Sequence, residues 1–493
     1  MVSERPRQHY GVTLGVLTTG ALAFALSQTM VAPALPEIQH ALGTSTTGVT
    51  WVITIYLLTA SVATPVLGRF GDMYGKNRML VAVLAIFGVG SAVAALSSSI
   101  GVLILGRAIQ GVGGAIFPLA FGIIRDEFPR EKVATGIGLI SATFGIGGGA
   151  GLVLSGVIVD HLDYEWIFWL GLAVVVPAAI ATRMFIPESP VKTPARIDWT
   201  GAALLSAALV ALLLAVSEGE GWGWTSPGVL GLFAAAAVIA VVWVRLEMRV
   251  PEPLVDMRMM RTRAVAATNL TGLFVGFGMF SSFIVVPQFV QIPTSTGYGF
   301  GASVTVAGLF LAPSAVVMLI GGPIAGSLGT RFGSRFPLLL GCAIATVAFV
   351  FLALFHDARW HIYAGTALQG VGISFAFASM ANLIVEAVPQ SATGVATGMN
   401  AIMRTIGGSL GAQVVASVIA ASVVAGGRLP AESGFTAAFA IAAGGTLAAL
   451  LAALAIPTRR RMLADARAAE VAPGGAPAPP AEEPARVLAG PSR

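Results

Sequence analysis

Fourteen apolar runs, each about 20 residues long and separated by short polar segments, dominate this sequence of 493 residues. A helix of about 20 apolar residues is needed to cross the roughly 30 Å hydrocarbon core of a bilayer. Each run is therefore predicted to be a membrane-spanning helix, because a helix satisfies its own backbone hydrogen bonds where water is absent. The predicted spans lie near residues 11–33, 48–70, 79–97, 101–124, 136–159, 166–186, 199–216, 227–246, 264–291, 304–329, 336–355, 360–385, 395–422 and 434–457.

The charge content supports the same class of protein. Hydrophobic residues make up 56% of the chain and charged residues 10%, whereas soluble domains carry about 25% charged residues. A soluble fold could not cover its surface with so few charges, so a polytopic membrane protein is predicted. The single cysteine, Cys342, excludes a disulfide framework, a thiolate zinc site and an iron–sulfur cluster built by this chain alone.

The positive charges predict the orientation. With the amino terminus placed inside, the external loops hold only Arg359 and Arg428, and the rule that positive charges stay inside then places both termini in the cytoplasm. The first run has no cleavage site and is predicted to be a retained helix. The composition, rich in Arg, Ala and Gly, points to a bacterial inner membrane. The cytoplasmic loops hold Arg69, Lys76, Arg78, Arg125, Arg130, Lys132, Arg183, Lys192, Arg196, Arg245, Arg249, Arg258, Arg261, Arg263, Arg331 and Arg335.

The two halves of the chain resemble each other. The stretch GRFGDMYGKNR from Gly68 is matched by GSLGTRFGSRF from Gly326, and GRAIQGVGG from Gly106 is matched by GTALQGVGI from Gly365. Both copies of the first stretch follow a span that runs inward, so the repeat is parallel in topology. Parallel repeats relate two bundles by an axis along the membrane normal.

The predicted fold is thus an all-α polytopic membrane protein with two pseudo-symmetric six-helix bundles and two extra helices. The bundles are predicted at residues 1–190 and 261–457, with the inserted helix pair at 191–260. The tail at 458–493 contains VAPGGAPAPPAEEPAR and is predicted to be disordered and cytoplasmic.

Two arginines lie inside predicted spans. Arg107 is about 9 Å and Arg404 about 13 Å inside its span at 1.5 Å per residue. An arginine at the centre of a bilayer costs at least about 2.5 kcal/mol, so both should face protein or water. Arg404 shares a helix face with Asn400, four residues earlier, and the pair is predicted to form a substrate-facing patch or an interhelix lock. Arg107, with Gln110, either faces the cavity or donates to helix-end carbonyls.

Other polar and small residues within spans are weaker candidates. Ser27, Gln28, Gln288 and Gln291 could line a largely apolar cavity, although such side chains often only bond a neighbouring helix. Small residues spaced by four predict close approach of another helix along Gly147, Gly151 and Ser155. The apolar lining would come from residues such as Phe117, Phe144, Phe280 and Phe283.

No Asp or Glu lies near the middle of a predicted span. If transport is coupled to protons, coupling must run through an acid at the end of a span, and Asp126 and Glu386 are the candidates. If neither titrates, transport is not tightly coupled to protons.

Several motifs resemble those of one known family. One tight cytoplasmic turn contains Gly68, Asp72, Gly75, Lys76 and Arg78. A second motif, in the fourth span, contains Arg107, Gln110, Gly111 and Gly113. A third, in the fifth span, contains Gly138, Gly147, Gly151 and Gly156. The stretches ARIDWTGAALL and EGWGWTSP flank the first inserted helix.

These motifs are similar to those of the major facilitator superfamily, in particular its fourteen-span drug:proton antiporters, over nearly the whole chain. The resemblance implies that Asp72, Lys76 and Arg78 form an ion network, joined by Asp126, that holds one state of the bundle interface closed. It also implies that Gly147 and Gly151 help to seal the protein against ion leak. Two positions depart from the family pattern: Leu152 stands where a proline is expected, and Ser27 where many exporters of cations carry an acid.

Three functions follow from this reading. The first is a secondary active transporter that exports amphipathic small molecules by alternating access, coupled to proton influx. The second is an exporter or flippase for one endogenous metabolite, antibiotic, lipid or peptide, with weak or different ion coupling. The third is an uptake carrier. The predicted partners are the bilayer, a small-molecule substrate and protons, for a monomer without cofactor, metal or nucleic acid. No nucleophile motif or phosphate-binding loop favours an enzyme.

Overall fold

The computed structural model describes residues 9–189, 192, 198–423 and 429–457. Every regular element within these residues is a helix, apart from an isolated β-bridge between Val423 and Pro430. Among them, 14 helices are long and apolar enough to cross a membrane, which confirms the predicted all-helical class. The helices of 11 residues or more are α1 (Tyr10–Thr29), α2 (Val31–Ala41), α3 (Thr46–Tyr74), α4 (Lys76–Ala95), α5 (Ile100–Gly111), α6 (Ile116–Glu127), α7 (Arg130–His161), α8 (Trp166–Phe185), α9 (Trp199–Trp222), α10 (Pro227–Glu247), α12 (Arg263–Gln291), α13 (Val304–Phe332), α14 (Arg335–Leu354), α15 (Arg359–Ala387), α16 (Thr393–Ala421) and α17 (Glu432–Leu454). Of these, α1 with the start of α2 forms one span, and α5 with α6 forms another.

Four short elements complete the described helices. The fourth predicted span is divided, because the stretch VGGA forms the 3-10 turn η1 (Val112–Ala115) between α5 and α6. The others are α11 (Met257–Met260), η2 (Thr294–Thr296) and η3 (Gln390–Ala392).

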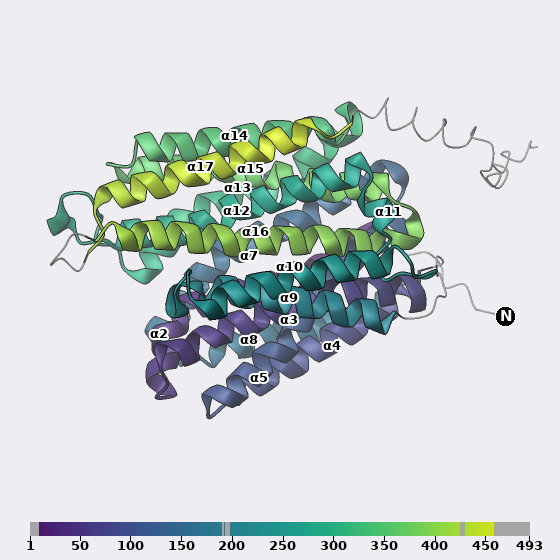
Figure 1. The fold of residues 1–493 in the computed structure, drawn as a ribbon, viewed down its shortest axis with the longest axis horizontal. Coiled ribbons are helices and arrows are strands. Elements are labelled where there is room, and N and C mark those ends of the chain that lie inside the picture. The colour runs from purple at the N-terminus through teal and green to yellow at the C-terminus, as the bar shows by residue number, and fades with distance from the viewer. Residues whose placement is uncertain (1–8, 190–191, 193–197, 424–428, 458–493) are drawn as a thin grey trace, which may run out of the picture. The chain divides into compact units, whose positions relative to one another are not determined.

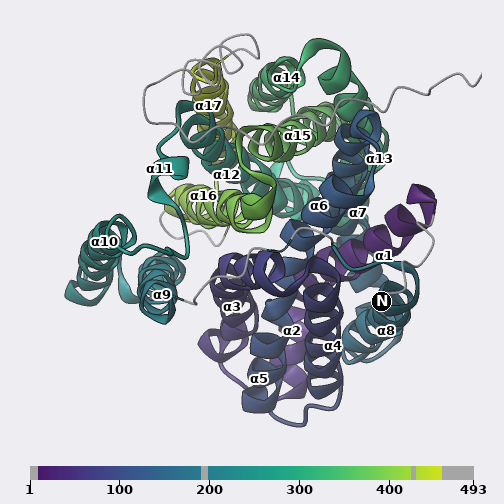
Figure 2. The same cartoon turned by 90° about the vertical axis from the view of Figure 1, so that its right-hand side faces the viewer.

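The helices form two groups with a separate pair beside them (Figure 1). Helices α1 to α8 lie together, α12 to α17 form the second group, and α9 and α10 lie at one side, with α10 outermost (Figure 2). The predicted divisions at residues 190, 260 and 457 stay predictions. The tail at 458–493, predicted to be disordered, lies outside the described residues.

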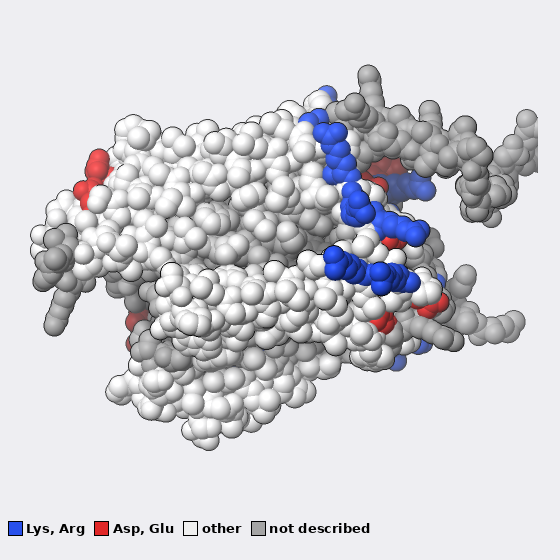
Figure 3. Space-filling model, viewed as in Figure 1, with Lys and Arg blue, Asp and Glu red and all other residues white. Residues whose placement is uncertain are grey.

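The two ends of the helix bundle differ in charge. Lysines and arginines gather at one end, with acidic residues among them, while the other end shows acidic residues in this view (Figure 3). We call the first the basic end; it carries Arg78, Arg245, Arg249, Arg258, Arg261, Arg263, Arg331 and Arg335 at the ends of helices α4, α10, α11, α12, α13 and α14. We call the second the acidic end; it carries Asp160, Asp163, Glu165, Asp357 and Glu432.

The repeated motif folds in the same way in both halves. Gly75 ends α3 with φ of 114°, and its counterpart Gly333 ends α13 with φ of 85°. Residues other than glycine rarely adopt such positive φ angles. Both glycines therefore allow the chain to reverse at once into the next helix.

The two groups of helices meet most closely where α7 lies against α13. A Cβ atom on Gly138 would clash with the carbonyl of Gly322, and one on Gly326 would lie 2.5 Å from the carbonyl of Ala134. The contact continues to the acidic end, where the Thr305 hydroxyl donates to Asp160 at 2.7 Å. The two helices are thus in contact from the basic to the acidic end, with close backbone contacts that only glycine permits at Gly138 and Gly326.

The glycine stripe chosen from the sequence packs elsewhere. A Cβ atom on Gly147 would clash with Ala25, and one on Gly151 with the Thr29 hydroxyl, which itself donates to the Gly147 carbonyl at 2.6 Å. The stripe therefore packs α7 against α1 inside the first half. It does not lie between the halves in this structure.

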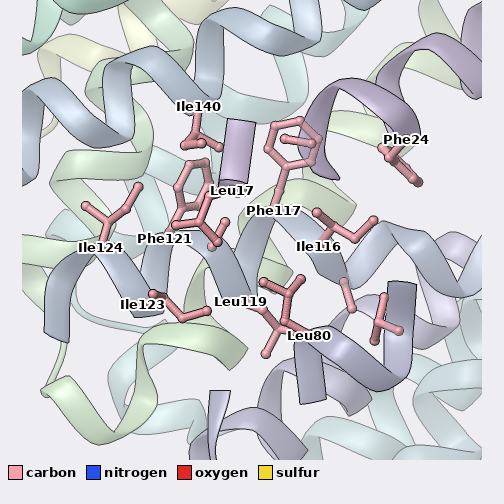
Figure 4. Packing of buried hydrophobic residues seen from close by; sticks show 14 of the residues in the cluster. Leu17, Phe24, Leu80, Ile116, Phe117, Leu119, Phe121, Ile123, Ile124 and Ile140 are labelled. Atoms are coloured by element: carbon pink, nitrogen blue, oxygen red, sulfur yellow. The ribbon is translucent and has the colours of Figure 1, made fainter. Parts of the chain in front are cut away.

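Each half has its own apolar core. In the first half, side chains from α1, α4, α6 and α7 pack together, and those of α6, such as Phe121 and Leu119, lie between Ile140 and Leu80 (Figure 4). In the second half, Phe289 of α12 contacts the rings of Phe435 and Phe439 of α17, at 5.4 and 6.4 Å between centroids. These cores hold each group of helices together and leave the polar residues described next at the boundary between the groups.

Candidate substrate cavity and gate

Two adjoining cavities lie between the halves. The larger has a volume of about 350 Å³ and the smaller about 40 Å³. They share five lining residues: Gln28, Leu57, Phe144, Phe280 and Thr405. The larger cavity lies toward the acidic end and the smaller toward the basic end, as shown by the positions of their linings along α3 and α16.

The walls of the cavities are mainly apolar and include several phenylalanines. Phe144 of α7 is central, with its ring centroid 5.2 Å from that of Phe117 and 5.8 Å from that of Phe377. Phe280 and Phe283 of α12 form a second pair at 5.9 Å. All four phenylalanines that the sequence analysis named therefore line these cavities. An apolar pocket with few polar groups is the usual form of a small-molecule site.

Arg404 supplies the charge of the smaller cavity. Its Nη1 donates to the Asn400 side chain at 2.8 Å, and its guanidinium lies 4.8 Å from the ring centroid of Phe377. No acidic side chain lines either cavity among the described residues. Asn400 is 1% exposed and also bonds Asn269 of α12 at 3.1 Å, so it positions Arg404 and does not itself face the cavity.

Gln28 lines both cavities. Its Oε1 is buried and has no hydrogen-bond partner among the described residues, so it is available to a ligand. Ser27, one residue earlier, is 3% exposed and uses its carbonyl to accept from Arg107. Gln288 and Gln291 lie exposed near the acidic end of α12, outside both linings.

Arg107 is completely buried and lines neither cavity. Its Nε donates to the Val52 carbonyl at 3.1 Å and its Nη1 to the Ser27 carbonyl at 3.2 Å. The guanidinium also lies 3.9 Å from the centroid of the Tyr56 ring. Gln110, likewise 0% exposed, accepts from Arg107 at 2.9 Å. The geometry is that of a donor linking helices α1, α3 and α5.

The basic end is closed by residues from both halves. Asp72 of α3 is 1% exposed, and its Oδ2 accepts from the backbone N–H of Gly394 at 3.1 Å and of Val395 at 3.4 Å. These amides lie in the first turn of α16, where they have no partner within the helix and carry the positive end of its dipole. Gly68 lies beside them, because a Cβ atom there would be 2.8 Å from the Gly394 carbonyl.

Lys76 joins this contact to a second carboxylate. Its Nζ lies 2.7 Å from Asp126 Oδ2 and 3.7 Å from Asp72 Oδ1, and all three side chains are almost completely buried. Asp126 also accepts from Gln390 of η3 at 2.8 Å and from the Ser189 hydroxyl. Asp126 thus bonds residues of both halves.

Arg125 adds a third bridge that the sequence analysis did not single out. Its guanidinium donates to the Thr393 hydroxyl at 2.6 Å and to the carbonyls of Val388 at 2.9 Å and Pro389 at 3.2 Å. We call Asp72, Lys76, Arg125, Asp126 and Gln390 the basic-end gate. The basic-end gate is recognisable only in the folded protein, because Arg125 and Gln390 belong to no repeated motif.

Other residues predicted for gating or coupling lie outside this gate. Arg78 is 73% exposed, and its Nε lies 3.4 Å from Glu188 of the same half. Gly75 lies beside Glu188 as well. Glu386 is exposed at the basic end of α15 and accepts from the Ser334 hydroxyl at 2.7 Å, again within one half.

Comparison with known proteins identifies the family. A model described as Major Facilitator Superfamily matches residues 17–412. The chain belongs to this superfamily. The resemblance seen in the motifs is therefore confirmed, and the gate and the cavity lie where two halves of a superfamily transporter meet.

Similar proteins cover most of this superfamily member. Multidrug resistance protein 3 of Bacillus subtilis (strain 168) is 30% identical over 370 residues, which are 74% of this chain and 71% of that protein. The tetracenomycin C resistance and export protein of Streptomyces glaucescens is 28% identical over 393 residues, 78% of this chain and 71% of that protein. Among solved structures, the human organic anion transporter MFSD10 (TETRAN) aligns with a TM-score of 0.64 and 16% identity, over 91% of this chain and 100% of that one. That likeness shows the fold.

Proposed function

We propose that the protein is a secondary transporter that exports amphipathic small molecules by alternating access, driven by proton influx. The observation that carries the proposal is an aromatic cavity between two halves, closed at the basic end by a charged gate. The relatives named for multidrug resistance and for tetracenomycin C export support the export of drug-like compounds. Export is favoured over the alternative of an uptake carrier for the same reason.

The basic end is the cytoplasmic end in this proposal. The concentration of Lys and Arg there supports it, because positively charged loops are retained in the cytoplasm. Both termini then lie in the cytoplasm of a bacterial cell, and the protein acts as a monomer in the inner membrane. The cavity in this structure is accordingly the outward-facing one, sealed from the cytoplasm by the basic-end gate.

Opening toward the cytoplasm requires the gate to break. Asp72, Arg125 and Asp126 each bond the second half, at the first turn of α16 and in the segment just before it. Asp126 is the residue proposed for proton coupling, because its carboxylate bonds Lys76 Nζ at 2.7 Å and Gln390 of the second half at 2.8 Å. Glu386, the other candidate, accepts from the Ser334 hydroxyl of its own half, whereas Asp126 bonds Gln390 of the second half, which favours Asp126.

A second candidate function concerns the charge of the substrate. Arg404 has a neutral amide and an aromatic ring as its partners, and no carboxylate lines the cavities among the described residues. A buried cation without a counter-ion attracts an anionic group. An exporter of one anionic or neutral endogenous product, such as an antibiotic, is therefore the alternative to broad export of drugs.

Efflux measurements test both functions. Inverted vesicles would be incubated with matched anionic, neutral and cationic amphipathic dyes in the medium, with and without a pH gradient. We expect gradient-dependent uptake into the vesicles. Arg404→Ala should weaken apparent affinity for the anionic dye about 10- to 100-fold, because a hydrogen bond to a charged group contributes about 1.5–3 kcal/mol. Arg404→Lys should retain part of it, and Arg331→Ala, at the basic end, should change nothing.

The results of these measurements distinguish the two proposed functions. Transport of several unrelated dyes with the gradient supports a multidrug antiporter. Transport of an anionic compound alone supports the second candidate. If no dye moves in either direction, or if Arg404→Ala transports all of them normally, the proposed site is wrong.

A further inference from the structure

The inserted helix pair places one helix at the boundary of the larger cavity. Helix α9 packs against α10, α3 and α16, whereas α10 contacts mainly α9. The view in Figure 2 shows α9 lying between α10 and the two main groups. Two residues near the acidic end of α9, Val216 and Ser217, belong to the lining of the 350 Å³ cavity. The insertion therefore reaches the space between the halves.

Helix α9 can reach this space because α3 and α16 are close together at one end and line the cavity at the other. At the basic end they touch, because a Cβ atom on Gly394 of α16 would lie 2.6 Å from the Gly68 carbonyl of α3. Toward the acidic end, Thr54 of α3 and Gln413 of α16 stand on different walls of the same cavity. The opposite side of the cavity has no such opening, since α7 and α13 stay in contact from Gly138 to Thr305.

Helix α9 covers the opening between α3 and α16. Val216 is 1% exposed, so it is packed between the cavity and the rest of the protein. Toward the basic end, Leu205 and Leu209 of α9 belong to one buried apolar cluster with Val395 and Ile402 of α16. The helix is thus anchored near the gate and extends along the opening to the acidic end.

Ser217 has the chemistry of a ligand contact. It is half-buried, and its hydroxyl makes no hydrogen bond to any described residue. Ser206 on the same helix differs, because its hydroxyl donates back to the Ala202 carbonyl at 2.6 Å. In a helix that is otherwise mostly apolar, a hydroxyl at a cavity wall that bonds no described residue is available to a substrate.

We propose that α9 is the side wall of the substrate cavity, and that Ser217 is a specificity-determining residue that contacts the substrate. The inserted pair thereby closes the cavity against the lipid on the side of α3 and α16. The contact between Ser217 and the substrate rests on the proposed export function. The position of α9 as a cavity wall is independent of that function, so the wall and the contact are tested separately.

Cysteine labelling tests the wall without any substrate. The chain has one cysteine, Cys342, which is 1% exposed, so a Cys342→Ser background removes it. Ser217→Cys would then be treated in intact cells with a membrane-impermeant methanethiosulfonate reagent. Ala234→Cys is the matched control, because Ala234 is exposed on α10, lies at a similar depth and lines neither cavity. Gln413→Cys, on α16 in the lining of the same cavity, is the positive control.

We expect Ser217→Cys to react at a rate within about tenfold of Gln413→Cys, while Ala234→Cys stays unmodified. The wall assignment would be overturned if Ser217→Cys and Ala234→Cys reacted equally. It would also be overturned if Ser217→Cys did not react while Gln413→Cys did. This result does not depend on whether the protein exports anything.

Transport tests the specificity role. Ser217→Trp should reduce export of bulky dyes at least tenfold and of small ones little, because the new ring would project into the cavity. Ala234→Trp should leave both unchanged. If Ser217→Trp reduces export of bulky and small dyes equally while the labelling results are as expected, Ser217 does not determine specificity, but the assignment of α9 as the cavity wall stands. Absence of transport in the unmodified protein would overturn the export function and with it the role of Ser217.

Discussion

The contact between Asp72 and the start of α16 provides the sharpest test of the gate. Asp72→Asn removes one negative charge at a buried position and keeps nearly the same shape. Lys76 retains Asp126 at 2.7 Å, so the substitution leaves no cation without a partner. The backbone N–H groups of Gly394 and Val395 would then face a neutral amide oxygen in place of a carboxylate.

The expected change in free energy follows from these two bonds. A hydrogen bond to a charged group contributes about 1.5–3 kcal/mol and one between neutral groups about 0.5–1.5 kcal/mol. Losing the charge should therefore cost the closed state about 1–3 kcal/mol in total. A free-energy difference of that size changes a two-state population ratio by roughly 5- to 150-fold. The shift favours opening at the basic end, because Asp72 makes these bonds only when the halves meet there.

Labelling from the basic end measures this shift. Ser61→Cys in the Cys342→Ser background is a suitable reporter, since Ser61 is 3% exposed and lines the smaller cavity behind the gate. In inverted vesicles, Asp72→Asn should raise its rate of modification by an impermeant thiol reagent about tenfold or more. Glu188→Gln is the control, because it removes a charge at the same end. The described residues that the Glu188 carboxylate bonds, Arg78 among them, all belong to the first half. Equal rates in the two variants would refute the assignment of Asp72 as part of the gate.

Three further expectations follow from the same contacts. Arg125→Ala removes three bonds to the segment before α16 and should raise Ser61→Cys labelling in inverted vesicles as Asp72→Asn does; an unchanged rate would exclude it from the gate. Gly322→Leu places a side chain against the Gly138 backbone and should abolish transport while the protein still reaches the membrane, as seen by transport assay and immunoblot. Arg107→Leu removes the hydrogen bonds to the carbonyls of Val52 and Ser27 and leaves the buried Gln110 Oε1 without its Arg107 donor, at about 1–3 kcal/mol for such an unsatisfied group, so the melting temperature in detergent should fall by several degrees; a melting curve like that of the unmodified protein would contradict a structural role.

The spans and the repeat were within reach of sequence reasoning. Each span is recognisable because crossing a bilayer requires a local run of apolar residues, and the structure places helices at all the predicted runs. The repeated turn was readable because only glycine suits the backbone of Gly75 and Gly333. Asp72 and Lys76 were found from the same motif, and the structure brings both into contact with residues that have no motif of their own.

The roles of individual polar residues were harder to assign. Arg107 and Arg404 looked alike in the sequence, since both are arginines inside spans. The structure separates them: Arg107 reaches the carbonyls of Ser27 and Val52, while Arg404 reaches the smaller cavity. The stripe at Gly147 and Gly151 was correctly read as a packing surface, but its partner helix could not be named without the fold.

From the amino-acid sequence alone it follows that this chain crosses a membrane in helices, which end of the bundle is basic, and that its two halves repeat one pattern. The folded arrangement was needed to learn which helix faces meet, that α9 joins the cavity wall, and that Arg125 and Gln390 complete the gate. The physical reason is that lipid tails and protein interior are about equally apolar. The hydrophobicity of a helix therefore shows that it is in the membrane, whereas the direction of its side chains depends on packing between residues far apart in the chain.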